Sequence, residues 1–142
     1  MNLPEKIPLF RVRYQPEEIH LWGEDKIIPS QALEKKRIWA FSALARPESF
    51  ERTLKNLGPE LLGFEAFPDH YVFQGKDLGR LIKRATRAGA EALVTTEKDG
   101  VRLTDFPRGS IPLWVLSIRH EFLGDDLTRF EAFLFGRLGG KP

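Results

Sequence analysis

The chain has 142 residues, a length that fits one ordinary domain of roughly 100–200 residues and excludes two full ones. Hydrophobic residues make up 42% of it and include 11 Phe and 3 Trp, so the chain can build a core and is not disordered throughout. The net charge is only +2, from 22 basic and 20 acidic residues, which gives no reason to expect a nucleic-acid partner.

Cysteine is absent, which excludes disulfides, thiolate metal sites and a cysteine nucleophile. The three histidines, His20, His70 and His120, lie fifty residues apart, without the i, i+4 spacing of a helical metal site, so we expect no metal site. No apolar stretch approaches the roughly 20 residues that cross a bilayer. The first ten residues contain an acid and two prolines in place of a signal peptide's apolar run. We therefore expect a soluble, cytoplasmic chain with no membrane span.

The first part of the chain, residues 7–28, is predicted to form short strands. The segments IPLFRVRY and EEIHLWGEDKII are rich in β-branched and aromatic residues, and they are broken by Pro16 and by the turn cluster 23–25. This pattern indicates a hairpin or meander, which needs support because a lone hairpin is only marginally stable in water. We expect residues 1–30 to be a β-hairpin linker and residues 31–142 to be a separate α/β unit.

From Arg37 onward, short apolar runs alternate with segments of helical periodicity, a pattern typical of βαβ units. The fold class predicted is α/β: a mostly parallel, Rossmann-like sheet of about four strands with flanking helices, preceded by the N-terminal β-hairpin. The predicted strands are 38–41, 60–64, 92–95 and 111–118, and the predicted helices are 47–57, 77–88, 97–103 and 127–138.

Ligands of open α/β sheets bind beyond the carboxyl ends of the strands, so polar residues directly after each strand are the first candidates. The connection after the first strand contains Arg46 and leads into a helix N-terminus, which is a possible anion site. Because that connection has no glycine-rich turn, a plain strand-to-helix connection is the favoured interpretation.

The second strand is followed by Asp69 and His70, an acid and an imidazole side by side after Pro68. Histidine titrates near neutral pH, and a neighbouring carboxylate can orient it for acid–base chemistry. An Asp that caps a turn, beside an exposed His, accounts for the same residues equally well. On spacing alone, both interpretations stay open.

The third strand is followed by five polar or charged residues, Thr95, Thr96, Glu97, Lys98 and Asp99. Either threonine could cap the short helix predicted after them, and that role needs no ligand. Because capping needs only one or two polar residues, the sequence slightly favours a functional cluster. The chain contains no G-x-x-x-x-G-K-[ST] segment, so it has no P-loop of its own.

Three motifs in this order resemble one known family. AFS at 40–42 with RPESF at 46–50, AFPDH at 66–70, and VTTEKDGVRL at 94–103 are similar to the C-terminal half of the tetraacyldisaccharide 4'-kinases. That family phosphorylates the 4' position of a lipid A precursor, with ATP and Mg²⁺, at the cytoplasmic face of the inner membrane. Two departures from its pattern are Ala43-Leu44, where Gly-Ile is typical, and Tyr71-Val72, where a second His and a Pro are frequent.

The resemblance implies that this chain is the C-terminal lobe of such a kinase. It implies that Asp69 and His70 belong to the active-site cleft between two lobes, where His70 would orient or tune a catalytic aspartate of the other half. The cluster 95–99 and Arg46 would position the substrate or the nucleotide, or the cluster would lock a loop of the lobe.

The partners implied by the resemblance are the missing N-terminal P-loop half and the lipid A disaccharide precursor. ATP and Mg²⁺ would be bound only in the complete enzyme, so we expect the chain alone to bind neither and to be inactive. The alternative is a non-catalytic binding or regulatory module that retains the α/β scaffold, since a fold does not determine a function.

Overall fold

The computed structural model describes residues 12–107 and 111–122. The chain divides into two compact units, one of residues 16–118 and the other of residues 1–15 and 119–142. All candidate functional residues lie in the first unit. The predicted helix 127–138 falls outside the described residues.

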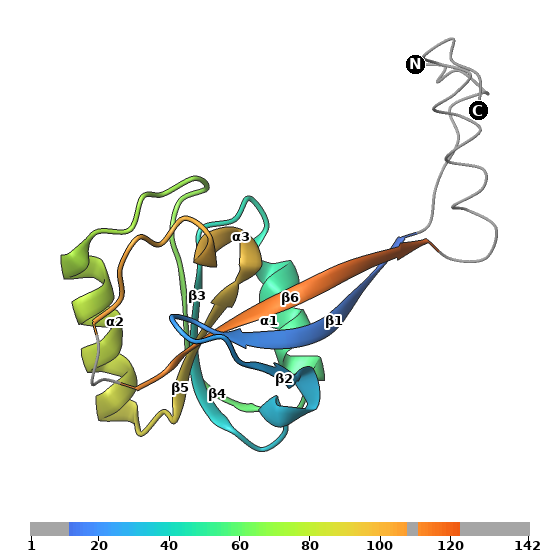
Figure 1. Cartoon of the computed structure of the whole chain (residues 1–142), viewed down its shortest axis with the longest axis horizontal. Helices are drawn as coiled ribbons and strands as arrows, with labels where there is room; N and C mark the ends of the chain where they lie inside the picture. Colours follow the sequence, from blue (N-terminus) through green and yellow to red (C-terminus); the bar gives the residue numbers. More distant parts are fainter. Residues whose placement is uncertain (1–11, 108–110, 123–142) are drawn as a thin grey trace, which may run out of the picture. The chain divides into compact units, whose positions relative to one another are not determined.

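A six-stranded mixed sheet, with strand order β2-β1-β6-β5-β3-β4, forms the centre of the fold (Figure 1). Its strands are β1 (Val12–Leu21), β2 (Ile27–Pro29), β3 (Arg37–Ser42), β4 (Glu60–Ala66), β5 (Ala92–Thr96) and β6 (Leu113–Phe122). β3 pairs in parallel with both β4 and β5, and β5 pairs in parallel with β6. The predicted parallel sheet of about four strands, within an α/β fold, is therefore confirmed.

The predicted N-terminal hairpin is also confirmed, because β1 and β2 pair antiparallel with Glu18 opposite Pro29. Two details differ from the prediction. β1 continues through Pro16, where we expected a break, and the hairpin strands extend the main sheet through β1, which lies next to β6. The Trp22 amide also donates to the Leu113 carbonyl at 3.0 Å. The neighbouring strand thus supplies the support that an isolated hairpin lacks.

In the described part of the chain, three helices and one 3₁₀ turn connect the strands: η1 (Ser30–Leu33), α1 (Pro47–Asn56), α2 (Gly75–Ala88) and α3 (Glu97–Gly100). α2 starts two residues before the predicted helix because Gln74 and Asp77 form a reciprocal capping box at its N-terminus. It ends at Gly89, whose φ of 85° is left-handed. α3 is shorter than the helix predicted over 97–103. None of the helices in the described part combines the length and apolar composition that spanning a bilayer requires.

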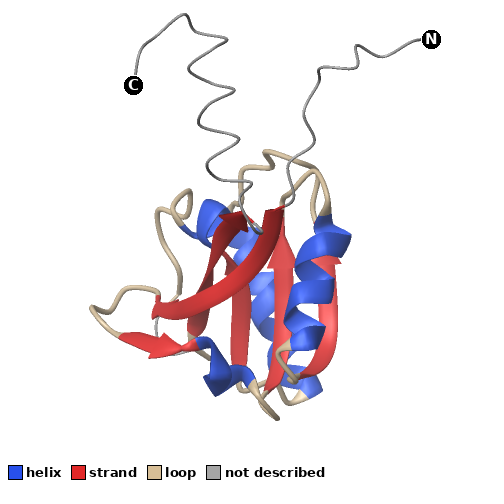
Figure 2. Ribbon diagram, turned by 90° about the vertical axis from the view of Figure 1, so that its right-hand side faces the viewer, coloured by secondary structure: helices blue, strands red, loops and turns tan. Residues whose placement is uncertain are grey.

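Helices cover both faces of the sheet (Figures 1 and 2), and successive strand residues alternate between two cores. Ile38 and Ala40 of β3 pack with the α1 residues Phe50 and Leu54. Phe41 packs on the opposite side with a cluster that includes Leu78, Leu81 and Ala85 of α2. Burial on both faces explains why the central strands β3 and β5 contain continuous apolar runs.

The order of the strands creates a topological switch point between β3 and β5. From β3 the chain crosses through α1 to β4 on one side, and then returns through α2 to β5 on the other side of β3. In open α/β sheets, the crevice beyond the carboxyl ends of two such strands is the usual place for a ligand. The residues that follow Ser42 and Thr96 therefore matter most for function.

Candidate functional site

The loops that follow β3, β4 and β5 lie at the same edge of the sheet, because these three strands are parallel. They are residues 43–46, residues 67–74, and α3 with its flanking residues. The Phe67 amide donates to the Ser42 carbonyl at 2.8 Å, which joins the second loop to the end of β3. The tertiary structure thus gathers all three polar clusters predicted from the sequence at one edge.

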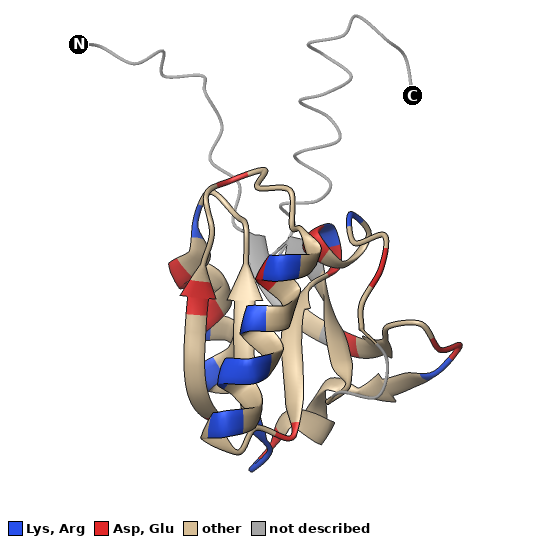
Figure 3. Cartoon of the chain, turned by 90° about the vertical axis from the view of Figure 1, so that its left-hand side faces the viewer, with Lys and Arg blue, Asp and Glu red and all other residues tan. Residues whose placement is uncertain are grey.

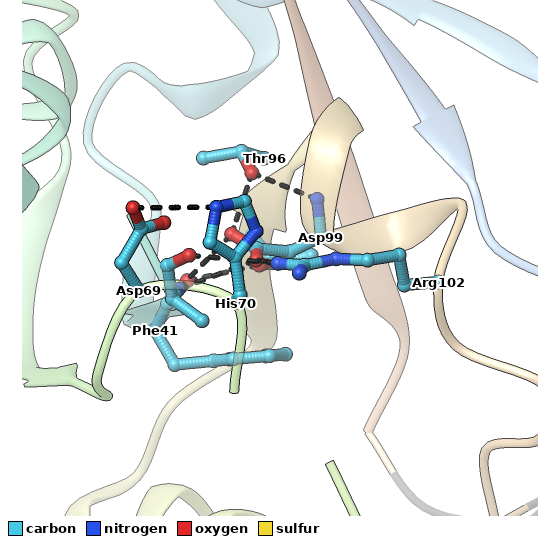
Figure 4. Close-up of polar contacts among 8 residues, drawn as sticks. Phe41, Asp69, His70, Thr96, Asp99 and Arg102 are labelled. Atoms are coloured by element: carbon cyan, nitrogen blue, oxygen red, sulfur yellow. Dashed lines mark hydrogen bonds and ion pairs between the residues drawn. The ribbon is translucent and has the colours of Figure 1, made fainter. Parts of the chain in front are cut away.

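A buried carboxylate, that of Asp99, occupies the switch point (Figure 4). Its Oδ2 accepts hydrogen bonds from the Ala43 amide at 3.2 Å and from the Thr96 hydroxyl at 2.6 Å. Its Oδ1 is 2.7 Å from Nη2 of Arg102, in a charge-assisted bond. Asp99 therefore bonds the segment after β5 to the loop after β3, at the place where such folds usually bind a ligand.

Arg102 was not among the residues predicted to form the site, although it completes this cluster. Its Nη2 also lies 3.5 Å from the Ala43 carbonyl, and its side chain is about one-third exposed. The spacing of three residues between Asp99 and Arg102, within a predicted helix, is a signal that could have identified the pair. Nothing in the sequence indicated that Asp99 and Arg102 both contact Ala43.

The two threonines of the cluster are buried and bonded to the protein itself. Thr96 caps α3, since the Asp99 amide donates to its Oγ1 at 3.1 Å. The Thr95 hydroxyl donates to the Phe41 carbonyl at 2.9 Å, across to the neighbouring strand. Thr96 thus has the capping role that the sequence also allowed, and the hydroxyl of Thr95 bonds β5 to β3.

The remaining charged residues of these two loops, Glu97, Lys98 and Arg46, are exposed at the same edge of the sheet. Glu97 and Lys98 begin α3, while Arg46 precedes the first turn of α1. Side chains in these positions are free to contact a ligand, whereas Thr95, Thr96 and Asp99 are held inside. The predicted cluster therefore divides into a buried part and an accessible part.

Asp69 and His70 form the tip of the loop between β4 and α2. The Tyr71 amide donates to the Pro68 carbonyl at 2.9 Å, which closes a tight turn around them. His70 has φ of 63°, a left-handed conformation that is uncommon for residues other than glycine. Its side chain is 71% exposed, and Nε2 lies 3.6 Å from Oδ2 of Asp69 (Figure 4). The turn thus presents an imidazole and a carboxylate together toward solvent.

No group of three or more potential ligands (His, Cys, Asp or Glu) comes together as a cation site within residues 12–107 and 111–122. The acidic residue at the switch point, Asp99, already has Arg102 as its counter-ion. Among the described residues we accordingly assign none to Mg²⁺.

Comparison with known proteins gives consistent matches. Residues 2–138 match the family described as Tetraacyldisaccharide-1-P 4'-kinase. A tetraacyldisaccharide 4'-kinase of Syntrophus aciditrophicus is 37% identical over 111 residues, which are 78% of this chain and 30% of the relative. One from Rickettsia peacockii is 39% identical over 118 residues, which are 82% of this chain and 35% of the relative. One from Anaeromyxobacter is 52% identical over 73 residues, which are 51% of this chain and 19% of the relative.

A solved structure has a similar fold. It is described as the "apo" form of LpxK from Aquifex aeolicus in complex with ATP, and it is 21% identical to this chain with a TM-score of 0.53. The similarity covers 94% of this chain and 38% of the solved chain. The chain thus spans roughly a third, or less, of the length of the relatives that it matches.

Proposed function

Because this chain belongs to the tetraacyldisaccharide-1-P 4'-kinase family, we propose that it is the C-terminal lobe of an ATP-dependent kinase acting on the 4' position of a lipid A precursor. Residues 31–142 would be the lobe itself and residues 1–30 the linker to a P-loop half. That half would hold ATP and Mg²⁺, at the cytoplasmic face of the membrane, and the acylated disaccharide would lie between the lobes. The chain alone would then be inactive.

The observation that carries the proposal is the exposed Asp69–His70 turn at the carboxyl edge of the sheet. Its side chains have no role in the core, and His70 keeps a left-handed backbone that a glycine would adopt more easily. Strain of this kind is typical of functional sites. We assign His70 to orienting the carboxylate that activates the sugar hydroxyl, and Asp69 to orienting His70. Phosphoryl transfer depends chiefly on such positioning and on charge stabilisation.

The cluster 95–99 is proposed to act mainly through the loop that it holds. Thr95, Thr96 and Asp99 would fix the loop after β3, so that Arg46 is presented to an anionic part of the nucleotide or substrate. Lys98 and Glu97 would contribute from the exposed start of α3. What supports this division is burial: the first three side chains are enclosed and hydrogen-bonded, and the other three are exposed.

The test joins this chain to the N-terminal part of one of the relatives above and measures transfer of phosphate from ATP to the acylated disaccharide. We expect activity in the joined protein and none in the chain alone. His70→Ala should lower kcat about 100-fold, with little change in KM for ATP, because it would disorient the carboxylate that acts as general base, and a general base contributes about 10²–10⁴-fold.

The matched control is His20→Ala, because His20 also lies near a carboxylate, at 3.4 Å from Glu18, and has no place in the proposed site. It should leave kcat unchanged. An inactive joined protein that is correctly folded would contradict the kinase-lobe proposal, and an unchanged kcat in His70→Ala would remove His70 from the mechanism.

A further inference from the structure

The exposed face of α2 carries only positive charge. Its exposed charged residues are Lys76, Arg80, Lys83, Arg84 and Arg87. At 100° per residue these five lie within an arc of about 100°, and they extend over about 16 Å of helix. Figure 3 shows basic residues repeated along the length of this helix. In a chain whose total charges nearly balance, this face is therefore distinctly basic.

The other long helix provides a contrast. α1 carries Glu48, Glu51, Arg52 and Lys55, so its charges balance, and Lys55 lies 3.4 Å from Glu51. The acid within α2, Asp77, is buried and used in the N-terminal cap, so it is not part of the exposed face.

Part of the charge on α2 is compensated by neighbours. Arg84 binds Glu65 at 2.8 Å, and Arg80 lies 3.7 Å from Asp77. Among the ion pairs of the described residues, none uses Lys76, Lys83 or Arg87. The uncompensated cations are therefore spread from the first turn of the helix to the last.

An exposed apolar side chain lies directly before this helix. Val72 is 77% exposed, in the loop that leads from His70 into α2. A basic helix face beside an exposed apolar side chain is suited to binding a lipid surface. The cations attract the phosphates of anionic headgroups, and the apolar side chain enters the interfacial region. A purely ionic partner such as a nucleic acid would give the exposed valine no role.

We propose that the basic face of α2, together with Val72, docks on the surface of an anionic lipid bilayer. The inference rests on the proposed function, because a substrate with four acyl chains resides in a membrane and its kinase has to reach it there. The loop that carries Asp69 and His70 continues directly into α2. Docking through α2 would thus hold that loop close to the headgroups, where the sugar hydroxyl lies.

The test measures binding of the full chain to vesicles by co-sedimentation. We expect binding to phosphatidylcholine vesicles that contain phosphatidylglycerol, weakening as salt is raised, and little binding to pure phosphatidylcholine. The variant Lys83→Gln/Arg87→Gln should bind about 25-fold more weakly, since each cation near an anionic surface contributes about fivefold. Val72→Ser should weaken binding further at any salt concentration.

The matched control is Arg52→Gln/Lys55→Gln on α1, which lowers the net charge equally and should bind almost as well as the parent chain. An equal loss of vesicle binding in the two double variants would overturn the proposal, because net charge alone would then explain the binding. Absence of binding to the anionic vesicles at low salt would overturn it as well. Tighter binding to duplex DNA than to vesicles, unaffected by Val72→Ser, would assign the face to another polyanion.

Failure of this inference and failure of the kinase proposal can be told apart with a substrate dissolved in detergent micelles. There, Lys83→Gln/Arg87→Gln in the joined protein should keep the parent kcat, because the change affects docking and not the transfer step. Vesicle binding without kinase activity would count against the proposed function alone. Kinase activity in micelles without vesicle binding would count against the docking surface alone.

Discussion

The Asp99 carboxylate accepts a hydrogen bond from the backbone amide of Ala43, at 3.2 Å, although 56 residues separate the two in the chain. The bond spans the switch point between β3 and β5. A backbone amide that could have faced a ligand is thus used by a side chain of the protein itself. The cluster after β5 therefore has a structural task, whatever it contributes to ligand binding.

Removing this carboxylate should destabilise the fold. Asp99→Ala leaves the Ala43 amide and Arg102 without their buried partner, and we expect the free energy of unfolding to fall by about 3 kcal/mol. Urea unfolding followed by tryptophan fluorescence measures this. Lys98→Ala, one residue away and exposed, should change stability by less than about 0.5 kcal/mol. Equal effects of the two substitutions would show that the buried contacts of Asp99 contribute nothing.

The left-handed backbone at His70 predicts a reversal of the usual preference for alanine over glycine. Because L-residues are strained at φ of 63°, His70→Gly should be more stable than His70→Ala by about 1 kcal/mol. At Arg80, inside α2, the order should be reversed: Arg80→Gly should be less stable than Arg80→Ala by about 1 kcal/mol. Urea unfolding of the four variants tests both signs, and a more stable alanine variant at position 70 would contradict the strained turn.

Acid should destabilise the chain partly through Asp77. Hydrogen bonding from the Gln74 amide, above all, and from the Tyr71 hydroxyl holds the pKa of Asp77 below its usual 3.8, although burial opposes this. The resulting stabilisation is complete above about pH 4 and is lost as pH falls through the lowered pKa. The free energy of unfolding should therefore depend less on pH below about pH 4 in Asp77→Asn.

The Tyr71→Phe variant separates the two donors to Asp77. This variant keeps the hydrogen bond from Gln74, which lowers the pKa of Asp77 more than the Tyr71 hydroxyl does. The dependence of its unfolding free energy on acid pH should therefore lie between that of the parent chain and that of Asp77→Asn. Acid dependence in Asp77→Asn identical to that of the parent chain would contradict the assignment.

Replacement of two glycines by alanine should change the stability of the chain in opposite directions. A Cβ at Gly63 would lie 2.5 Å from the Trp39 ring, so Gly63→Ala should lower stability by about 2 kcal/mol. A Cβ at Gly79 would meet nothing within 4 Å, and alanine favours the helix, so Gly79→Ala should raise stability by about 0.5–1 kcal/mol. Thermal and urea unfolding measure both, and a stabilising Gly63→Ala would contradict the packing of Trp39 on β4.

The sequence by itself determined most of the elements. The apolar runs 38–41 and 92–95 predicted buried parallel strands, and the structure has strands there because helices cover both faces. The helix that begins at Pro47 and the one that ends before Gly89 were also predicted, since capping and periodicity are local properties. The sequence also predicted that polar residues, including Asp69 and His70, follow strands, because the end of a strand is a local property too.

Only the tertiary structure decided how these elements combine. That β1 extends the same sheet, and that Thr95 bonds to Phe41 and Asp99 to Ala43, depends on strand order. The catalytic and positioning roles of the site residues remain predictions. Periodicity and capping reflect residues within a few positions of each other, so a sequence reveals them directly. Contacts across more than fifty residues arise only when the sheet is assembled, and the energy that selects them is spread over the whole core.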